Sequence, residues 1–105
     1  MPSAVFNGVV IAEADETVVV EGNHYFPPES LNREFFTETP AYTTTCPWKG
    51  LASYYDVEVN GERAEAVAWT YKDPSDRASK IKEHVAFYPK VRIEGAPKGG
   101  FFSRG

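Results

Sequence analysis

Residues 50–71 read GLASYYDVEVNGERAEAVAWTY, and this stretch decides the fold. At its centre, Asn60-Gly61 favours the type I′ turn of a two-residue β-hairpin, because both turn positions need a positive φ. The flanking residues are rich in valine, tyrosine and tryptophan, which suits strands. We therefore expect strands at 51–59 and 62–71 on either side of this turn.

The turn also predicts a register for the hairpin. Small side chains then face larger ones on one side of it: Val57 and Ala64, Tyr55 and Ala66, Ser53 and Ala68. The other side pairs Glu58 with Arg63, Tyr54 with Val67 and Ala52 with Trp69. The same register places Gly50 opposite Tyr71 at the base of the hairpin. The segment 46–49 is therefore expected beside Trp69 and Tyr71.

Upstream, the sequence predicts further short strands. Val9 to Val20 alternates around Ala14-Asp15-Glu16, which indicates a hairpin. His24-Tyr25-Phe26 extends a strand that Pro27-Pro28 stops. The following ESLNREFF is expected to form a short helix with proline in its first turn. Residues 37–45 have no helical period and contain a proline, so they are a loop or an edge strand.

Downstream, Asp73-Pro74-Ser75-Asp76 predicts the start of a second short helix. Asp73 fits the N-cap, Pro74 the first helical position, and acidic side chains suit the helix dipole. Ala78, Ile81 and Val85 follow at helical spacing. Short strands are expected at 86–88 and 91–93.

Composition indicates one mainly β domain. The 105 residues suit a single core, and aromatic residues make up 14% of them. We expect a domain at 1–95 with one or two short helices. The glycine-rich segment 96–105 is expected to be a flexible tail, unless Phe101 and Phe102 dock on the body or on another subunit.

Charge and cysteine content narrow the partners. The net charge is −4 without a Lys/Arg cluster, so a nucleic acid is not expected to bind. Cys46 is the single cysteine, which leaves no internal disulfide and no paired zinc motif. The N-terminus has neither a signal-peptide pattern nor a membrane span. A cytoplasmic monomer or homodimer is the expectation, and the sequence names no cofactor.

Three stretches resemble a widespread bacterial family of unknown function that carries a nucleotidyltransferase label. They are YFPPESL, TTTCPWKGLASYYDV and AWTYKDPSDRASKIKEHVAFYPKVRIE, and the resemblance runs from about Phe6 to Glu94. The CPWKG run and the later AWxY run are its most specific parts. The resemblance implies a compact, mostly β barrel or a tent-like sandwich.

The residues themselves do not supply the chemistry of nucleotidyl transfer. That reaction needs closely placed carboxylates to hold Mg²⁺ on a triphosphate. The chain has no phosphate-binding G-x-x-x-x-G-K-[ST] loop and no Asp-x-Asp pair. Asp73 and Asp76 are the nearest approach, and helix capping explains them.

The most interesting residues cluster where the hairpin is expected to close. Seven of them form the predicted ligand site: Cys46, Trp48, Lys49, Gly50, Tyr54, Trp69 and Tyr71. Lys49 could receive a phosphate or carboxylate, pair with a ring, or be an ordinary surface lysine. Cys46 could be a nucleophile whose pKa Lys49 lowers, or a buried inert thiol. The rings could stack on a flat ligand or be plain core.

Histidines and metal ligands give weaker signals. His24 or His84 could act as a base for Cys46, but nothing in the sequence places either beside it. A zinc site from these three residues lacks the usual ligand spacing, so no metal is predicted. Three functions stay open: a small-molecule-binding domain, an enzyme with Cys46 or Lys49 as nucleophile, and a protein-interaction module.

Overall fold

The computed structural model describes residues 1–95, which form a mainly β fold of three antiparallel sheets. One sheet has three strands, in the order β2 (Val9–Glu13), β1 (Ser3–Phe6), β9 (Arg92–Glu94). A second pairs β3 (Val18–Val20) with β4 (Asn23–Tyr25). The third has the order β5 (Phe36–Cys46), β6 (Gly50–Val59), β7 (Glu62–Thr70), β8 (Val85–Phe87). Within these residues the sheets stay separate and do not close into one barrel.

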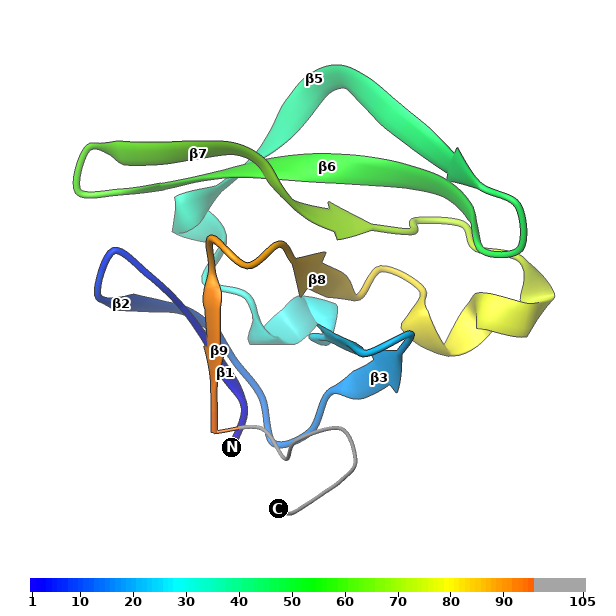
Figure 1. The fold of residues 1–105 in the computed structure, drawn as a ribbon, viewed down its shortest axis with the longest axis horizontal. Coiled ribbons are helices and arrows are strands. Elements are labelled where there is room, and N and C mark those ends of the chain that lie inside the picture. The colour runs from blue at the N-terminus through cyan, green and yellow to red at the C-terminus, as the bar shows by residue number, and fades with distance from the viewer. Residues whose placement is uncertain (96–105) are drawn as a thin grey trace.

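Figure 1 shows how the sheets are arranged. The long strands β5, β6 and β7 form the upper layer, and β3 and β8 lie below them. Strands β1, β2 and β9 lie on the left of this view, below the turn between β6 and β7. Phe26 and Val85 exchange backbone hydrogen bonds of 2.8 and 2.9 Å, which ties the end of β4 to β8.

The predicted β6–β7 hairpin is present, and its register matches the prediction only near the turn. Val59 pairs with Glu62, and Val57 pairs with Ala64. Beyond Val57 a bulge shifts the pairing by two residues, so that Trp69 faces Tyr54 instead of Ala52. The shift is even, so the residues that pair beyond the bulge keep the faces that the sequence predicts. Within the bulge the prediction is wrong, because Ala66 packs with Trp69 and Val67 packs with Val57.

Asp56 and Ala66 make this bulge. Ala66 has a φ of 51°, in the left-handed region, and its N–H donates to Asp56 Oδ1 over 2.8 Å. With this shifted register Gly50 lies level with Asp73, and its Cα is therefore close to the chain that follows β7. An added Cβ at Gly50 would lie 3.6 Å from the carbonyl oxygen of Asp73.

The hairpin predicted for 9–20 is wrong. Strand β2 pairs with β1 through the turn Asn7-Gly8, and β3 pairs with β4 through the turn Glu21-Gly22. Asn7 and Glu21 have φ values of 51° and 54°, close to the 50° of Asn60. The same local signal that marks the β6–β7 turn was therefore present at Asn7-Gly8 and determines the pairing.

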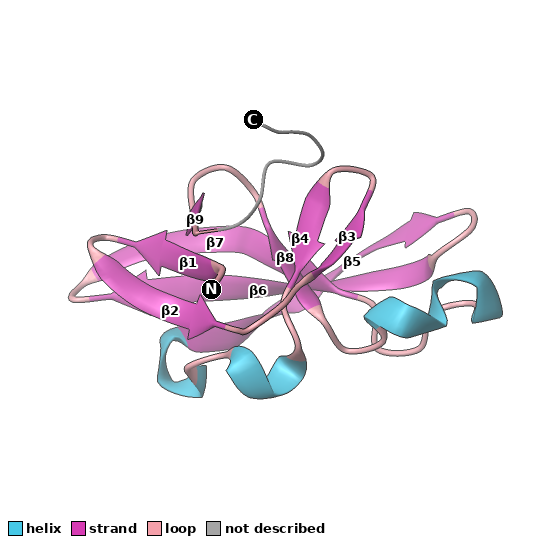
Figure 2. Cartoon of the chain, turned by 90° about the horizontal axis from the view of Figure 1, so that it is seen from below, coloured by secondary structure: helices cyan, strands magenta, loops and turns pink. Residues whose placement is uncertain are grey.

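The helical predictions are correct in place and wrong in type. The residues expected to form one short helix make two single 3₁₀ turns, Pro28–Ser30 and Arg33–Phe35. The second helix is a 3₁₀ segment, Asp76–Ile81, with Ser75 rather than Asp73 at its N-cap. These three segments lie along one side of the sheets (Figure 2). Helix capping does not explain Asp73.

The ambiguous segment 37–45 belongs to β5, an edge strand of the largest sheet. Its pairing with β6 is interrupted between Glu38 and Thr43, where Pro40 and the positive φ of Ala41 break the ladder. The strands predicted at 86–88 and 91–93 are β8 and β9. The expected tail, 96–105, lies outside the described residues, as do its phenylalanines.

Two clusters of buried side chains form the core. The larger one is mainly aliphatic and packs the three-stranded sheet against β6, β7 and β8. The smaller one is rich in tyrosine and includes Tyr25, Tyr54 and Tyr71, with Trp48 and Trp69 packed against it. A surface cleft, lined partly by polar side chains, lies beside this second cluster.

Candidate functional site

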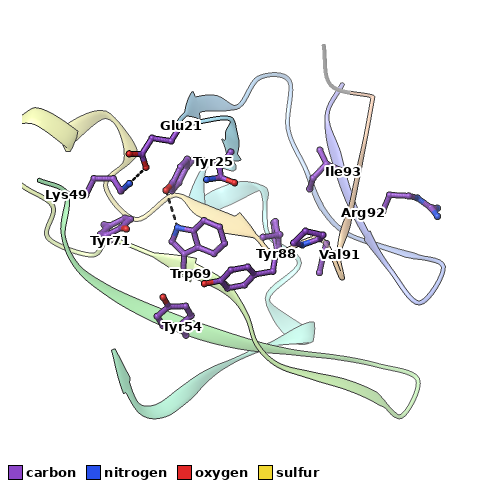
Figure 3. Close-up of a pocket in the computed structure, with 13 residues that line it drawn as sticks. Glu21, Tyr25, Lys49, Tyr54, Trp69, Tyr71, Tyr88, Val91, Arg92 and Ile93 are labelled. Atoms are coloured by element: carbon purple, nitrogen blue, oxygen red, sulfur yellow. Dashed lines mark hydrogen bonds and ion pairs between the residues drawn. The ribbon is translucent and has the colours of Figure 1, made fainter. Parts of the chain in front are cut away.

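A cleft of about 660 Å³ opens beside the tyrosine-rich cluster. It lies where the β6–β7 hairpin, the β3–β4 hairpin and the segment from β8 to β9 approach one another (Figure 3). Its lining residues are Glu21, Asn23, Tyr25, Lys49, Tyr54, Trp69, Tyr71, Phe87, Tyr88, Pro89, Val91, Arg92 and Ile93. Ligand pockets in proteins have volumes of this order.

The strand geometry explains why aromatic rings gather here. Trp69 and Tyr71 are two residues apart, so they point to the same face of the sheet. The bulge in the hairpin brings Trp69 directly opposite Tyr54 on β6. Tyr25 comes from the end of β4, and Tyr88 follows β8. Segments that are distant in sequence thus supply one aromatic wall.

Trp69 is the centre of this wall. Its indole N–H donates to the hydroxyl of Tyr25 over 3.1 Å, and the two rings meet edge to face with centroids 6.3 Å apart. Its other neighbour is Tyr88, whose ring centroid lies 4.7 Å away. Trp69 is only half-buried, so part of its ring is available to a ligand.

The hydroxyls of Tyr71 and Tyr88 stay protonated at neutral pH. Burial raises the pKa of Tyr71 above its ordinary range, and nearby negative groups add to the effect. Burial, together with the neighbouring Tyr54 hydroxyl, raises the pKa of Tyr88 to about 12. Neutral hydroxyls can both donate and accept hydrogen bonds. The wall therefore offers polar contacts without adding charge.

Lys49 is the buried cation of the cleft. It is 5% exposed, and its Nζ lies 5.0 Å from the ring centroid of Trp48 and 5.7 Å from that of Tyr71. It also donates to the carboxylate of Glu21 (Figure 3). Burial acts to lower the pKa of Lys49, but the hydrogen bond to Glu21 and nearby groups raise it overall. Lys49 is therefore an ammonium group and not a free surface lysine.

Glu21 completes the charged end of the cleft. Hydrogen bonds from Lys49 and then from Trp48 lower the pKa of its carboxyl. The Trp48 Nε1–H donates to Glu21 Oε2 over 3.3 Å. Glu21 was not among the predicted site residues, because a Glu-Gly dipeptide carries no sign of a partner 28 positions away. Only the β3–β4 turn brings it there.

The structure separates the predicted site residues into two groups. Lys49, Tyr54, Trp69 and Tyr71 line the cleft together. Cys46, Trp48 and Gly50 do not line it, although they belong to the turn that carries Lys49. A backbone hydrogen bond joins that turn to the segment after β7, because the Ser75 N–H donates to the Lys49 carbonyl over 3.0 Å.

Cys46 ends β5 and is half-buried. Burial acts to raise the pKa of its thiol, but backbone N–H groups of Trp48 and Lys49 outweigh burial and lower the pKa, with help from the Lys49 ammonium. The predicted influence of Lys49 on Cys46 agrees with the direction of this pKa shift, in which the backbone N–H groups have the larger effect.

The histidines have other partners. His24 Nδ1 is 2.7 Å from the Thr17 hydroxyl, and His84 Nδ1 is 2.9 Å from the Lys82 carbonyl. Among residues 1–95, no group of three or more His, Cys, Asp or Glu side chains is placed to hold a metal ion. No helical segment there has the length and apolar character needed to cross a bilayer.

Fold and cleft together define the class: a small antiparallel β domain with an aromatic cleft that has an ion pair at one end. The chain belongs to the family described as Domain of unknown function (DUF427), whose profile matches residues 3–96. This confirms the predicted family. Its short name refers to nucleotidyl transfer, while its description leaves the function open. No curated protein matches the chain.

Proposed function

We propose that this domain binds a small, flat molecule in the aromatic cleft. The supporting observation is the convergence of six rings on one cleft of about 660 Å³: Tyr25, Tyr54, Trp69, Tyr71, Phe87 and Tyr88. Trp69 is half-buried and Tyr88 is 45% exposed, and partly exposed rings can stack on a flat ligand.

Polar groups at one end of the cleft would orient the ligand. Lys49 supplies a fixed positive charge, Glu21 a half-exposed carboxylate, and Asn23 an amide. In this proposal Trp69 and Tyr88, the cleft rings that are not buried, supply the stacking surface. Gly50 acts indirectly, since it shapes the turn that presents Lys49. Trp48 lies beside Lys49 and donates to Glu21, which lines the cleft.

A thermal-shift panel tests the proposal. It would contain nucleotides, sugar phosphates and small aromatic acids, each with and without Mg²⁺. A ligand at 100 times its Kd adds about 2.7 kcal/mol of stability, which raises the Tm of a domain this size by about 10–20 °C. A nucleoside triphosphate that acts only with Mg²⁺ would support the nucleotidyltransferase label. A panel without any shift would contradict small-molecule binding.

Lys49→Met is the variant for this panel, since Lys49→Ala would remove a side chain packed between two rings. Methionine keeps most of the buried length and removes the charge. We expect the shift seen with acidic ligands to disappear in Lys49→Met. Loss of shifts for neutral and acidic ligands alike would indicate a purely structural role for Lys49.

A second candidate is chemistry at the Cys46 thiol, which its lowered pKa favours. The thiolate is the nucleophilic form of cysteine. Lys49 is a poor candidate for the nucleophile, because its raised pKa keeps it protonated. The alkylation rate of Cys46 tests this second candidate.

Location and assembly complete the proposal. A cytoplasmic location suits a half-buried thiol in a chain with a single cysteine, because thiols stay reduced there. Cell fractionation would test it. The domain is proposed to be a monomer or homodimer, and light scattering separates these two states.

A further inference from the structure

Two hydrogen-bond donors converge on a single carboxylate at the end of the cleft. Lys49 Nζ donates to Glu21 Oε1, and Trp48 Nε1 donates to Glu21 Oε2 over 3.3 Å. Each oxygen of the carboxylate therefore has its own donor. This arrangement suits a carboxylate in general, whichever molecule carries it.

The two partners of the ion pair differ in burial. The Lys49 side chain is 6% exposed, whereas that of Glu21 is 52% exposed. Lys49 lies over the rings of Trp48 and Tyr71, and its turn is hydrogen-bonded to Ser75. None of these contacts depends on Glu21. If Glu21 moved away, both donors would keep their places.

Glu21 sits on a backbone that favours other residues. It is the first residue of the two-residue turn Glu21-Gly22, and its φ is 54°. Glycine and asparagine are preferred at this position because side chains crowd the backbone there. The ion pair with Lys49 offsets the backbone cost of a glutamate at this position. A carboxylate of a ligand could form the same ion pair in place of Glu21.

We propose that Lys49 and Trp48 form a carboxylate subsite of the cleft, which Glu21 fills in the free protein, and that the ligand is an aromatic carboxylate whose acid group displaces Glu21. This rests on the proposed function, because Glu21 and Lys49 line the same cleft as Tyr71 and Trp69. An acid group at Lys49 would bring an attached ring onto that aromatic wall (Figure 3).

Glu21 would then act as an internal competitor. If it occupies the donors about nine-tenths of the time, the apparent affinity for an aromatic carboxylate falls about tenfold. Glu21→Gln removes its charge and should return most of this affinity. A neutral ligand of the same shape does not compete with Glu21, so the substitution should not change its binding.

Titration calorimetry with two probes tests the proposal: 2-naphthoate and its neutral analogue 2-naphthamide. The proteins are the wild type, Glu21→Gln, Lys49→Met and the control Glu38→Gln. Glu38 forms a similar ion pair with Lys72, is 50% exposed and lies outside the cleft lining. We expect Glu21→Gln to bind 2-naphthoate about tenfold more tightly, Lys49→Met to lose it, and Glu38→Gln to match the wild type.

The outcomes separate the two proposals. Weaker 2-naphthoate binding in Glu21→Gln overturns the displacement of Glu21. Equal binding of both probes, unchanged by either cleft variant, overturns the subsite and leaves the aromatic cleft standing. If neither probe binds wild type or Glu21→Gln, the subsite falls, and the broader panel then decides on the cleft. Should Lys49→Met fail to fold, the comparison of Glu21→Gln with Glu38→Gln still decides.

Discussion

Single residues show two ways in which this domain accommodates a buried charge. Lys49 lies between two rings and pairs with a half-exposed glutamate. Asp56, 3% exposed, is satisfied within the sheet: it accepts from Thr39, from the Ala66 N–H at 2.8 Å and from Arg63 at 2.6 Å. The first charge is the one that we propose to bind a ligand, and the second one stabilises the bulge.

Asp56→Ala should be strongly destabilising. It removes the buried acceptor of the Ala66 N–H, the Thr39 hydroxyl and one Arg63 N–H, which costs about 2–3 kcal/mol of unfolding free energy. Urea denaturation measures this cost. The control is Glu58→Gln, since Glu58 is 55% exposed and also contacts Arg63. We expect the control to stay within about 0.5 kcal/mol of the wild type. Similar losses in both variants would contradict a special role for Asp56.

The same residue predicts a pH dependence. Burial acts to raise the pKa of Asp56, but hydrogen bonds from Thr39 and Ala66 and the charge of Arg63 lower it below its ordinary value. Its stabilising effect is therefore complete above about pH 4, the pKa of an unfolded aspartate. The effect is lost as the pH falls through the folded pKa. The stability gap between wild type and Asp56→Asn should shrink over that range, and a constant gap would exclude this linkage.

Cys46 should alkylate faster at pH 7 than a free thiol of pKa about 8.5. The reason is its lowered pKa, which the amides of Trp48 and Lys49 and the Lys49 ammonium cause against the effect of burial. Lys49→Met should raise the pKa of Cys46 and slow the reaction. Iodoacetamide rates from pH 6 to pH 10 measure both. A rate no faster than that of the free thiol would remove the second candidate function.

At the scale of single elements, turns and bulges determine what each strand presents. The sequence predicted the β6–β7 hairpin because Asn60-Gly61 is a strong local signal. It could not predict the bulge, since nothing local shows that Asp56 will accept from Ala66. The predicted hairpin at 9–20 failed for a related reason: strand alternation alone does not choose a partner, and the Asn7-Gly8 turn does.

The bulge predicts opposite effects of glycine at two positions of β7. Ala66 has a φ of 51°, which costs a side chain about 1–2 kcal/mol. Ala66→Gly removes that cost and should be neutral or stabilising by up to about 1 kcal/mol, after glycine's entropic cost. Ala64 pairs regularly with Val57, so Ala64→Gly should destabilise by about 1 kcal/mol. Thermal unfolding of both variants checks this contrast, which the reverse order would contradict.

At the scale of the whole molecule, the cleft exists because two hairpins, β3–β4 and β6–β7, meet the segment from β8 to β9. Lys49, Tyr54, Trp69 and Tyr71 were predictable because they belong to one hairpin or its base. Glu21, Tyr25 and Tyr88 were not, since the docking of other elements brings them there. Aromatic composition indicated a ring-rich core, but only the tertiary arrangement turns part of it into a cleft.

The most direct test of the cleft compares two rings of the β6–β7 hairpin that face opposite ways. Trp69 lines the cleft and Tyr55 does not, and both are half-buried. The measurement is the Kd of 2-naphthoate for Trp69→Leu and for Tyr55→Leu, by titration calorimetry. Loss of the aromatic contact should weaken binding to Trp69→Leu about tenfold, while Tyr55→Leu should bind like the wild type. Unchanged affinity in Trp69→Leu, or equal losses in both, would contradict a ligand site in the cleft.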